Sequence, residues 1–523
     1  MAFLKRVIEW VTTHWAVIVL IGFAAGIQIF LISQPLQYLL SSILPDDAFY
    51  YFEIVRNITQ GAGSTFDGEN FTNGYHPLWA LILIPIFALF SHGGTMDLEP
   101  IRAALAVSVL INIGTLTLLY QILGHLTKDR MFRFAGLFFY ALNPFVLTET
   151  INGLETALSL FSIAVFFLVT LYVEKHETRK TYAWLGIVGG IMILARLDTA
   201  LYFAAVLLWL CFRKGWSHGF ARVCMAGVIA TAICSPWFIW NVTHFGMLLT
   251  SASETGSLVS HTLIIQDHGA SVFQSLKATV YNLYNAVDTL LVRTGALWVV
   301  LILFGVYITT ILKTLSSIPR RFSQLNGFQV LGIGFLLLFF VNVAIRWGGR
   351  AWYFMSFEFF IAMLVTIVVA SLSLHKKTVI FGLIVLTIFF FGVSWSREIR
   401  DQYINQVEIF SMAEWMSEHL SPNTRVGVFN SGIIGYFSNV HSINIDGLVN
   451  NASYHAMKEH RLWAYIQSED VEYIADFPIS LSYRYKSFFG IDDVFPHLIK
   501  EHSILITPTG RNPEGIVLYR IKE

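Results

Sequence analysis

The chain has 523 residues, of which 55% are hydrophobic, 15% are aromatic and only 13% are charged, and its mean hydropathy is +0.62. Soluble globular proteins carry about twice that share of charged residues, so the composition excludes an ordinary water-soluble enzyme. Lysine plus arginine and aspartate plus glutamate number 34 each, which gives a net charge of zero. This balance creates no positive field for a polyanion and excludes a nucleic-acid-binding protein.

Long apolar segments dominate the first three quarters of the chain. Runs of roughly 15 to 24 apolar residues recur from Trp15 to about Trp395, and such lengths suit helices that cross a bilayer. After Trp395 the sequence becomes mixed and polar up to Glu523. The first run follows Lys5 and Arg6 and is longer than the core of a signal peptide, so we expect it to stay in the protein as its first helix. The pattern predicts a polytopic α-helical membrane protein with a soluble tail.

Positive charges in short loops indicate the cytoplasmic side of the membrane, because lysine and arginine are enriched there. Loops of this kind occur at residues 5–6, 128–133, 175–180, 213–222, 313–321 and 376–377. The apolar piece at 77–92 would be only about 24 Å long as a helix and contains Pro85, so we expect it to lie on the outer membrane surface. This topology has about 11 transmembrane helices, a cytoplasmic N-terminus and an extracytoplasmic tail.

The domain boundaries follow from the same pattern. We predict a transmembrane domain over residues 1–400 and an extracytoplasmic α/β domain over 401–523, where helical and strand patterns alternate. Outer loops are expected at 38–100, which would hold interfacial helices, and at 241–295. Spans are expected near 15–37, 101–124, 132–147, 154–174, 182–195, 199–213, 221–240, 296–315, 328–345, 352–373 and 378–396. In the tail, a helix is expected at 406–419 and strands at 425–429, 442–446, 471–475, 503–507 and 515–521.

Ionisable residues gather in the segments that this topology places outside. Asp46 and Asp47 follow the first span and begin a helix, although carboxylates in a first turn also simply complement the helix dipole. Glu155 stands at the mouth of an otherwise uncharged span and therefore needs a partner or water. Arg196 and Asp198 lie at a membrane boundary, where a structural ion pair is the simpler explanation.

Two arginines and one histidine are further candidates on the outer side. Arg346 and Arg350 go against the trend of positive charge inside and have aromatic neighbours. A guanidinium group at this level could bind a lipid phosphate or could merely extend to the headgroups. His76 follows a turn-rich segment, where a lone histidine is commonly structural. No spacing of histidine, aspartate and glutamate here matches a metal site.

Two motifs of the first outer loop resemble the GT-C membrane glycosyltransferases. They are Asp46-Asp47-Ala48-Phe49-Tyr50-Tyr51 and Asn73-Gly74-Tyr75-His76-Pro77-Leu78-Trp79. Related patterns occur in protein O-mannosyltransferases, in the aminoarabinose transferases that modify lipid A and in mycobacterial arabinofuranosyltransferases. Other similar positions are Gly61 with Gly63, Asn143-Pro144, Gly153-Leu154-Glu155-Thr156, Arg196 with Asp198, and Arg350 with Tyr353.

The resemblance implies an inverting glycosyltransferase. Such an enzyme would move a sugar from a polyprenyl-phosphate-linked donor to a hydroxyl group of a glycan, lipid or protein. The reaction would take place on the extracytoplasmic face, and we expect a bacterial inner membrane as the location. Some members of this superfamily use a divalent metal and others use none, so a divalent metal stays an option and no other cofactor is implied.

The resemblance also assigns roles to residues. The general base, the leading member of the acidic pair, falls on Asp46, with Asp47 supporting it. Arg350, Arg346 and His76 would bind the donor phosphate. Because a phosphate ester is already a good leaving group, one base is enough, whereas a glycosidase needs two carboxylates. Further residues are expected to bind substrate or to organise the site: Glu53, Asn73, Tyr75, Glu155, Arg196, Asp198 and Tyr353.

Two other functions fit the same residues. Charged groups inside a membrane domain also mark the pathway of a transporter, here one for a lipid-linked sugar, although the spans show no internal repeat. A non-catalytic scaffold is the second alternative, in which the acidic pair only caps a helix and the tail binds a partner. Replacing Asp46 separates these hypotheses, because only an enzyme would lose turnover while keeping its fold and lipid binding.

Overall fold

The structure is a computed structural model that describes residues 2–91, 94, 96–213, 216–268, 271–288, 325–345, 350–371, 402–506 and 513–522, with isolated positions between 382 and 395. Arg346, the predicted span at 296–315 and most of the span predicted at 378–396 lie outside these described residues.

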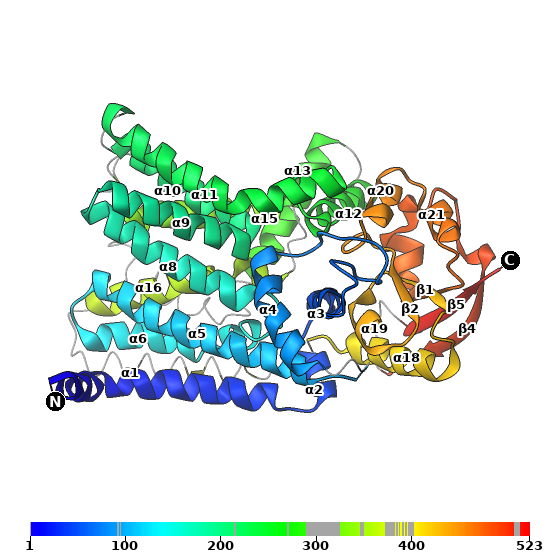
Figure 1. Ribbon diagram of the computed structural model, residues 1–523, viewed down its shortest axis with the longest axis horizontal. Coiled ribbons are helices and arrows are strands. Elements are labelled where there is room, and N and C mark those ends of the chain that lie inside the picture. The colour runs from blue at the N-terminus through cyan, green and yellow to red at the C-terminus, as the bar shows by residue number, and fades with distance from the viewer. Residues whose placement is uncertain are drawn as a thin grey trace.

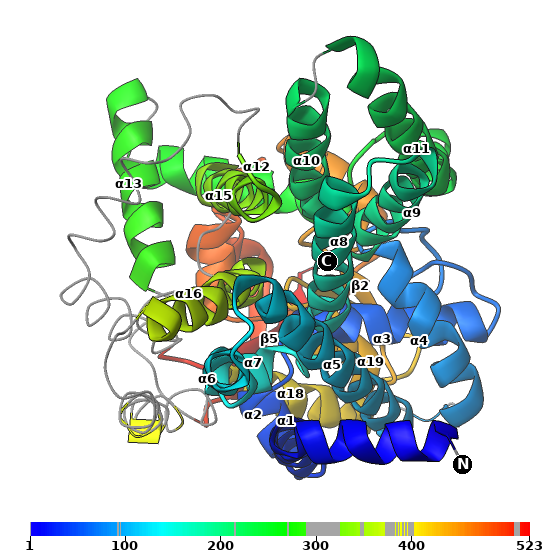
Figure 2. The ribbon, with the colours of Figure 1, turned by 90° about the vertical axis from the view of Figure 1, so that its left-hand side faces the viewer.

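A bundle of long helices forms one end of the molecule, and Figure 1 shows the tail at the opposite end. Figure 2 looks along the bundle with the tail behind it. Neighbouring pairs in the bundle include α9 with α11, α5 with α8, and α10 with α15. Its helices are α1 (Ala2–Ile32), α5 (Glu99–Leu126), α6 (Arg130–Ala141), α8 (Thr156–Lys175), α9 (Arg179–Ala195), α10 (Ala200–Arg213), α11 (Trp216–Phe245), α15 (Gly327–Ile345) and α16 (Phe357–Ser371).

The bundle has the properties of an integral membrane protein. Within the described residues, 4 helices are long and apolar enough to cross a membrane, namely His14–Ile32, Glu99–Leu126, Thr156–Lys175 and Gly219–Phe245. Large apolar side chains such as Trp15, Phe23 and Phe30 of α1 are exposed, which suits a helix that faces lipid rather than water. The short predicted spans at 182–195 and 199–213 are separate helices, α9 and α10, joined by a turn at Leu197–Thr199.

The predicted span at 132–147 is divided into two helices. α6 ends at Ala141, and α7 (Pro144–Glu149) begins after Asn143. The side chain of Asn143 accepts a hydrogen bond from the backbone N–H of Phe145 at 3.1 Å and so caps the second helix. Pro144 is the first residue of that helix, where its missing N–H costs nothing. The break therefore follows from the Asn-Pro pair, which the hydropathy pattern does not register.

Three helices of the first loop lie between the bundle and the tail: α2 (Leu36–Ser42), α3 (Asp46–Thr59) and α4 (Pro77–Phe90). In Figure 1, α4 runs across the direction of the bundle helices and α3 is seen end-on. Such an orientation is the one expected for helices that lie along a membrane surface. The second predicted outer loop also contains helices, α12 (Ser251–His268) and α13 (Val272–Asp288).

The tail contains the small sheet that the sequence predicted. Its order is β2-β1-β3-β5-β4, with β1 parallel to β2 and β3, and β5 antiparallel to β3 and β4. β4 begins five residues earlier than the predicted 503–507, because its exposed Lys500 and Glu501 interrupt the alternation of a typical strand. The tail elements are α18 (Asn405–His419), β1 (Arg425–Val428), α19 (Ser431–Phe437), β2 (His441–Asn444), α20 (Asn451–Lys458), α21 (Leu462–Ser468), β3 (Tyr473–Asp476), β4 (Leu498–Ile504) and β5 (Ile516–Ile521).

The tail and the first loop share one hydrophobic core. Phe49 and Phe52 of α3 pack in the same buried cluster as Phe410 of α18 and Tyr436 of α19. Close approach of the backbones depends on Gly432, where an added Cβ atom would lie 2.2 Å from the carbonyl oxygen of residue 46. The tail is therefore packed directly onto the helix that begins with the acidic pair.

Candidate active site

A cavity of about 370 Å³ lies at the end of the bundle, between the first loop and the tail. Its wall includes side chains from segments that are far apart in the chain. The polar and aromatic residues among them are Asp47, Tyr50, Tyr51, Tyr75, His76, Glu155, Asp198, Thr250, Ser253, Thr255, Arg350, Trp352, Tyr353, Arg484 and Tyr485.

The two adjacent aspartates face different surroundings. They are the first two residues of α3, and consecutive residues on a helix point about 100° apart. The carboxylate of Asp46 accepts hydrogen bonds from the backbone N–H groups of Ile433 at 2.8 Å and Gly432 at 3.1 Å, at the start of α19. Asp47 lines the cavity instead. The sequence assigned the base to Asp46, but the contacts make Asp46 a link to the tail and leave Asp47 facing the cavity.

Burial changes the acidity of Asp46. It raises the pKa of this carboxyl group to about 7, the hydrogen bond from Ile433 lowers it, and the nearby charge of Asp47 raises it further. A second contact also holds α3 against α19, because Arg56 donates to the carbonyl oxygens of Tyr436 at 3.0 Å and Gly435 at 3.4 Å. Asp46 and Arg56 thus attach both ends of α3 to the tail.

Arg350 provides positive charge at the cavity. Its guanidinium carbon lies 5.3 Å from the centre of the Trp352 ring, so the aromatic ring supports the cation. Burial lowers the pKa of Arg350, but the charge of Asp47 and the neighbouring tyrosine hydroxyls raise it by more. Asp47 and Arg350 are therefore close enough to influence each other across the cavity, which brings together the acidic and basic residues that the sequence predicted.

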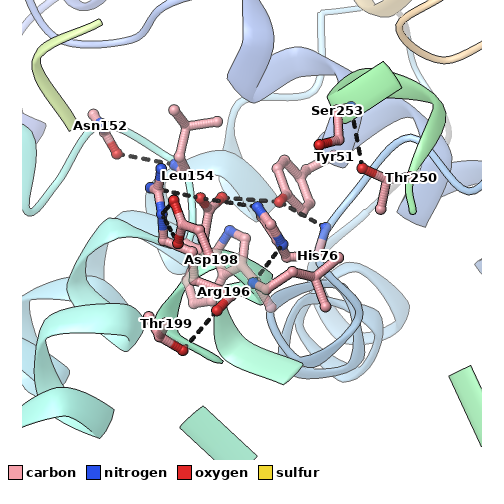
Figure 3. Close-up of polar contacts among 12 residues, drawn as sticks. Tyr51, His76, Asn152, Leu154, Arg196, Asp198, Thr199, Thr250 and Ser253 are labelled. Carbon is pink, nitrogen blue, oxygen red and sulfur yellow. Dashed lines mark hydrogen bonds and ion pairs between the residues drawn. The ribbon is translucent and has the colours of Figure 1, made fainter. Parts of the chain in front are cut away.

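A network of charges forms the bundle side of the cavity, and Figure 3 shows it around Tyr51, His76, Arg196 and Asp198. The Tyr51 hydroxyl donates to Glu155 Oε2 at 2.8 Å. Arg196 binds Glu155 Oε1 at 3.1 Å and Asp198 Oδ1 at 3.0 Å, and its own side chain is only 4% exposed. We call Tyr51, His76, Glu155, Arg196 and Asp198 the bundle-side network. Glu155 and Asp198 line the cavity, whereas Arg196 does not and contacts it through these two carboxylates.

His76 belongs to this network. Its Nε2 atom lies 3.6 Å from Glu155 Oε1, and its backbone N–H donates to the Tyr51 hydroxyl at 3.0 Å. His76 lines the cavity, and the Glu155 carboxylate is a charged partner of its imidazole. These contacts indicate that His76 helps to position Glu155, which differs from the phosphate contact that the sequence assigned to it. Tyr353 also joins this side, because the Arg196 guanidinium lies 4.8 Å from its ring centre.

Three predicted residues have supporting positions. Tyr75 lines the cavity and its hydroxyl bonds with that of Ser64 at 2.8 Å. Asn73 is buried, and its Oδ1 atom accepts from the backbone of Ser251 at 3.1 Å, which fixes the start of α12. Glu53 forms an ion pair with Arg56 and does not line the cavity. Burial raises the pKa of Glu53 to about 7, and Arg56 lowers it.

The tail adds three cavity residues that the sequence analysis did not select, namely Leu448, Arg484 and Tyr485. Arg484 and Tyr485 lie in the segment Tyr483-Arg484-Tyr485-Lys486, where a cation between aromatic residues is the only signal of a site. No spacing in the sequence connects this segment with the first loop. In the part of the chain that the structure describes, no three histidine, cysteine, aspartate or glutamate side chains are grouped as a metal site would need.

Two family models match parts of this chain. Residues 76–240 match the family model of the dolichyl-phosphate-mannose-protein mannosyltransferases, and residues 397–511 match a domain of unknown function, DUF8728. A search of curated proteins gave no match.

Solved structures match along almost the whole chain. ArnT from Cupriavidus metallidurans bound to undecaprenyl phosphate is 12% identical with a TM-score of 0.59, and the match covers 97% of this chain and 98% of that one. The oligosaccharyltransferase AglB from Archaeoglobus fulgidus in complex with an inhibitory peptide and a dolichol-phosphate is 12% identical with a TM-score of 0.55, and covers 92% and 72%. The chain therefore has the fold of the GT-C glycosyltransferases, as its motifs predicted.

Proposed function

We propose that this protein is an inverting glycosyltransferase that moves a sugar from a polyprenyl-phosphate-linked donor to a hydroxyl group on the extracytoplasmic face. One observation carries the proposal: a cavity at the end of an apolar bundle is lined by both the carboxylate of Asp47 and the guanidinium group of Arg350. The polyprenyl phosphates in the solved structures of the same fold support a lipid-linked donor here. The charge pattern of the loops supports the outer face.

Asp47 is the better candidate for the general base. Among the described residues, none makes a hydrogen bond or ion pair with the Asp47 carboxylate, so its lone pairs can accept a proton from an acceptor hydroxyl. Asp46 already uses both oxygens to accept backbone N–H groups. We therefore assign the base to Asp47 and give Asp46 a structural role that holds α3 in place.

The proposed reaction is a single displacement. The acceptor oxygen attacks C1 of the donor sugar while its proton moves to the carboxylate of Asp47. The bond between C1 and the phosphate oxygen breaks, and its electron pair stays on the phosphate, where Arg350 stabilises the growing negative charge. Attack and departure occur on opposite faces of C1, so the anomeric configuration inverts. Arg346, which the sequence analysis also assigned to the donor phosphate, lies outside the described residues.

The bundle-side network has a positioning role in this proposal. Glu155 accepts a hydrogen bond from the Tyr51 hydroxyl and forms an ion pair with Arg196, and Arg196 forms a second ion pair with Asp198. Each of these groups already has partners, so the network fixes the wall on which donor and acceptor must lie. In this proposal Asp47 is therefore the carboxylate that accepts the proton of the acceptor hydroxyl.

Transfer from defined donors tests the proposal. Purified protein would be incubated with a panel of polyprenyl-phosphate sugars, and free polyprenyl phosphate and glycosylated product would be followed by mass spectrometry. We expect turnover with at least one donor, inverted product, and a loss of at least about a hundredfold in Asp47→Asn. Asp46→Asn is the matched control and should keep most of the turnover. Full activity of Asp47→Asn, or a loss confined to Asp46→Asn, would refute the assignment of the base.

A further inference from the structure

The tail contributes a cation to the cavity. Arg484 lines the cavity together with Asp47 and Arg350, although it lies more than a hundred residues beyond Arg350 in the chain. It is the last residue of a short π-helix, Ser480–Arg484. Segments of π-helix are rare and frequently occur at functional sites. The position of Arg484 at the end of this π-helix and in the cavity wall is therefore typical of a functional residue.

Buried contacts fix the segment that carries Arg484. Asp476, which is 1% exposed, accepts from the Ser480 hydroxyl at 2.6 Å and from the backbone N–H groups of Phe429 at 3.1 Å and Asn430 at 2.9 Å. The ring of Tyr485 stacks on that of Phe429, with centroids 4.2 Å apart. The π-helix is thus anchored at its first turn and directly after its last residue, which sets where Arg484 enters the cavity.

The charges around Arg484 favour an anion. Arg350 from the bundle and Arg484 from the tail both act on the Tyr485 hydroxyl, which places two guanidinium groups around the same part of the cavity. Burial raises the pKa of the neighbouring Asp446 to about 8, with smaller effects from its hydrogen bonds and from Arg484. The raised pKa weakens the negative charge that Asp446 places beside Arg484 near neutral pH.

We infer that Arg484 is a second phosphate-binding residue, which stabilises the departing polyprenyl phosphate and makes the tail a part of the active site. This inference rests on the proposed function, because it presumes a phosphate leaving group in the cavity. It assigns the tail a role in the chemical step instead of a separate binding role.

The leaving group explains the need for a second cation. In the donor the phosphate is a diester with one negative charge, whereas the released monoester carries about 1.5 to 2 negative charges at neutral pH. As the bond between C1 and the phosphate oxygen breaks, the electron pair of that bond moves to the phosphate. A second guanidinium group then gains more interaction with the departing phosphate than with the donor, so it accelerates the reaction.

Lipid binding by the full-length protein tests the inference without knowledge of the sugar. The probes are undecaprenyl phosphate, its methyl ester as a singly charged mimic of the donor, and undecaprenol as the uncharged control. Arg484→Gln should weaken binding of undecaprenyl phosphate roughly ten- to hundredfold, weaken the methyl ester less, and leave undecaprenol unchanged. Arg484→Lys, which keeps the charge, should fall between wild type and Arg484→Gln.

The controls separate this inference from the proposed function. Lys486 is exposed two residues further on, so Lys486→Ala should bind all three lipids like wild type. Arg350→Ala should weaken the binding of both charged lipids.

If Arg350→Ala weakens their binding and Arg484→Gln does not, Arg484 is not a phosphate ligand and the inference is wrong. If neither variant changes the binding of any charged lipid, the phosphate site of the proposed function fails as well. If Arg484→Gln does not fold, Arg484→Lys is the deciding variant. A folded Arg484→Lys protein that binds the charged lipids as weakly as Arg350→Ala does would contradict a role that depends on the charge of Arg484.

Discussion

Charged groups have different surroundings on two sides of the cavity: the bundle side, with Glu155, Arg196 and Asp198, and the tail-facing side, with Asp47. On the bundle side, Glu155, Arg196 and Asp198 form a buried chain of ion pairs in which each group has a partner. On the tail-facing side, Asp47 has no hydrogen bond from any residue that the structure describes. Ion-paired groups give geometry and stability, whereas a charge that faces a cavity without such a partner is available to a substrate. The difference supports the proposal that Asp47, and not the bundle-side network, carries the chemistry.

Breaking the bundle-side network should give the largest effect on stability. Arg196→Ala leaves Glu155 and Asp198 as buried carboxylates without their cation, which should lower the free energy of unfolding by about 3 to 5 kcal/mol. Arg213→Ala is the control, because Arg213 is 26% exposed and its ion pairs with Glu174 and Glu177 should contribute less than about 1 kcal/mol. Thermal unfolding in detergent measures both. Equal shifts for the two variants would contradict the contrast between buried and solvated pairs.

Asp46 should give a smaller effect that depends on pH. Its pKa is raised in the folded protein from 3.8 to about 7, so the native state binds more protons than the unfolded state between these values. The stability of wild type relative to Asp46→Asn should therefore fall as pH rises from about 4 to about 7 and stay level above that. Thermal unfolding of both proteins across this range provides the measurement. A relative stability that rises with pH would mean that the N-terminus of α19 holds Asp46 as an anion.

Asp47→Asn should have the smallest effect on stability. Because no hydrogen bond from the described residues is lost, the free energy of unfolding should change by no more than about 0.5 kcal/mol, even though turnover should fall by at least about a hundredfold. The same thermal assay checks this. A loss as large as that of Arg196→Ala would make Asp47 a structural residue and remove the difference between the two sides.

The sequence predicted the parts of the fold and site that depend on local patterns. Hydropathy located the apolar helices, and alternation located four of the five strands close to their positions. The motifs of the first loop selected the acidic pair, and Arg350 was selected because the predicted topology places this positive charge on the outer side. The Arg196–Asp198 ion pair was expected because its members are two residues apart.

Contacts between distant segments could not be predicted in this way. The choice between Asp46 and Asp47 depends on the N-terminus of α19, which follows 386 residues after Asp46. Likewise, Glu155 finds Arg196 only after α8 and α9 pack, and Arg484 reaches the cavity only because the tail docks on α3. A single sequence contains no local signal for such contacts, since they are set by the packing of whole elements.

The attachment of Asp46 to Gly432 also determines when the protein can first become active during its synthesis. At the usual 5 to 20 residues per second, the 386 residues between them take roughly 20 to 80 s to translate. Throughout that interval Phe49 and Phe52 of α3 lack the aromatic partners that α19 later supplies. A nascent chain with a complete bundle therefore has a cavity without Arg484, and under the function proposed above it can transfer no sugar before the tail has docked on α3.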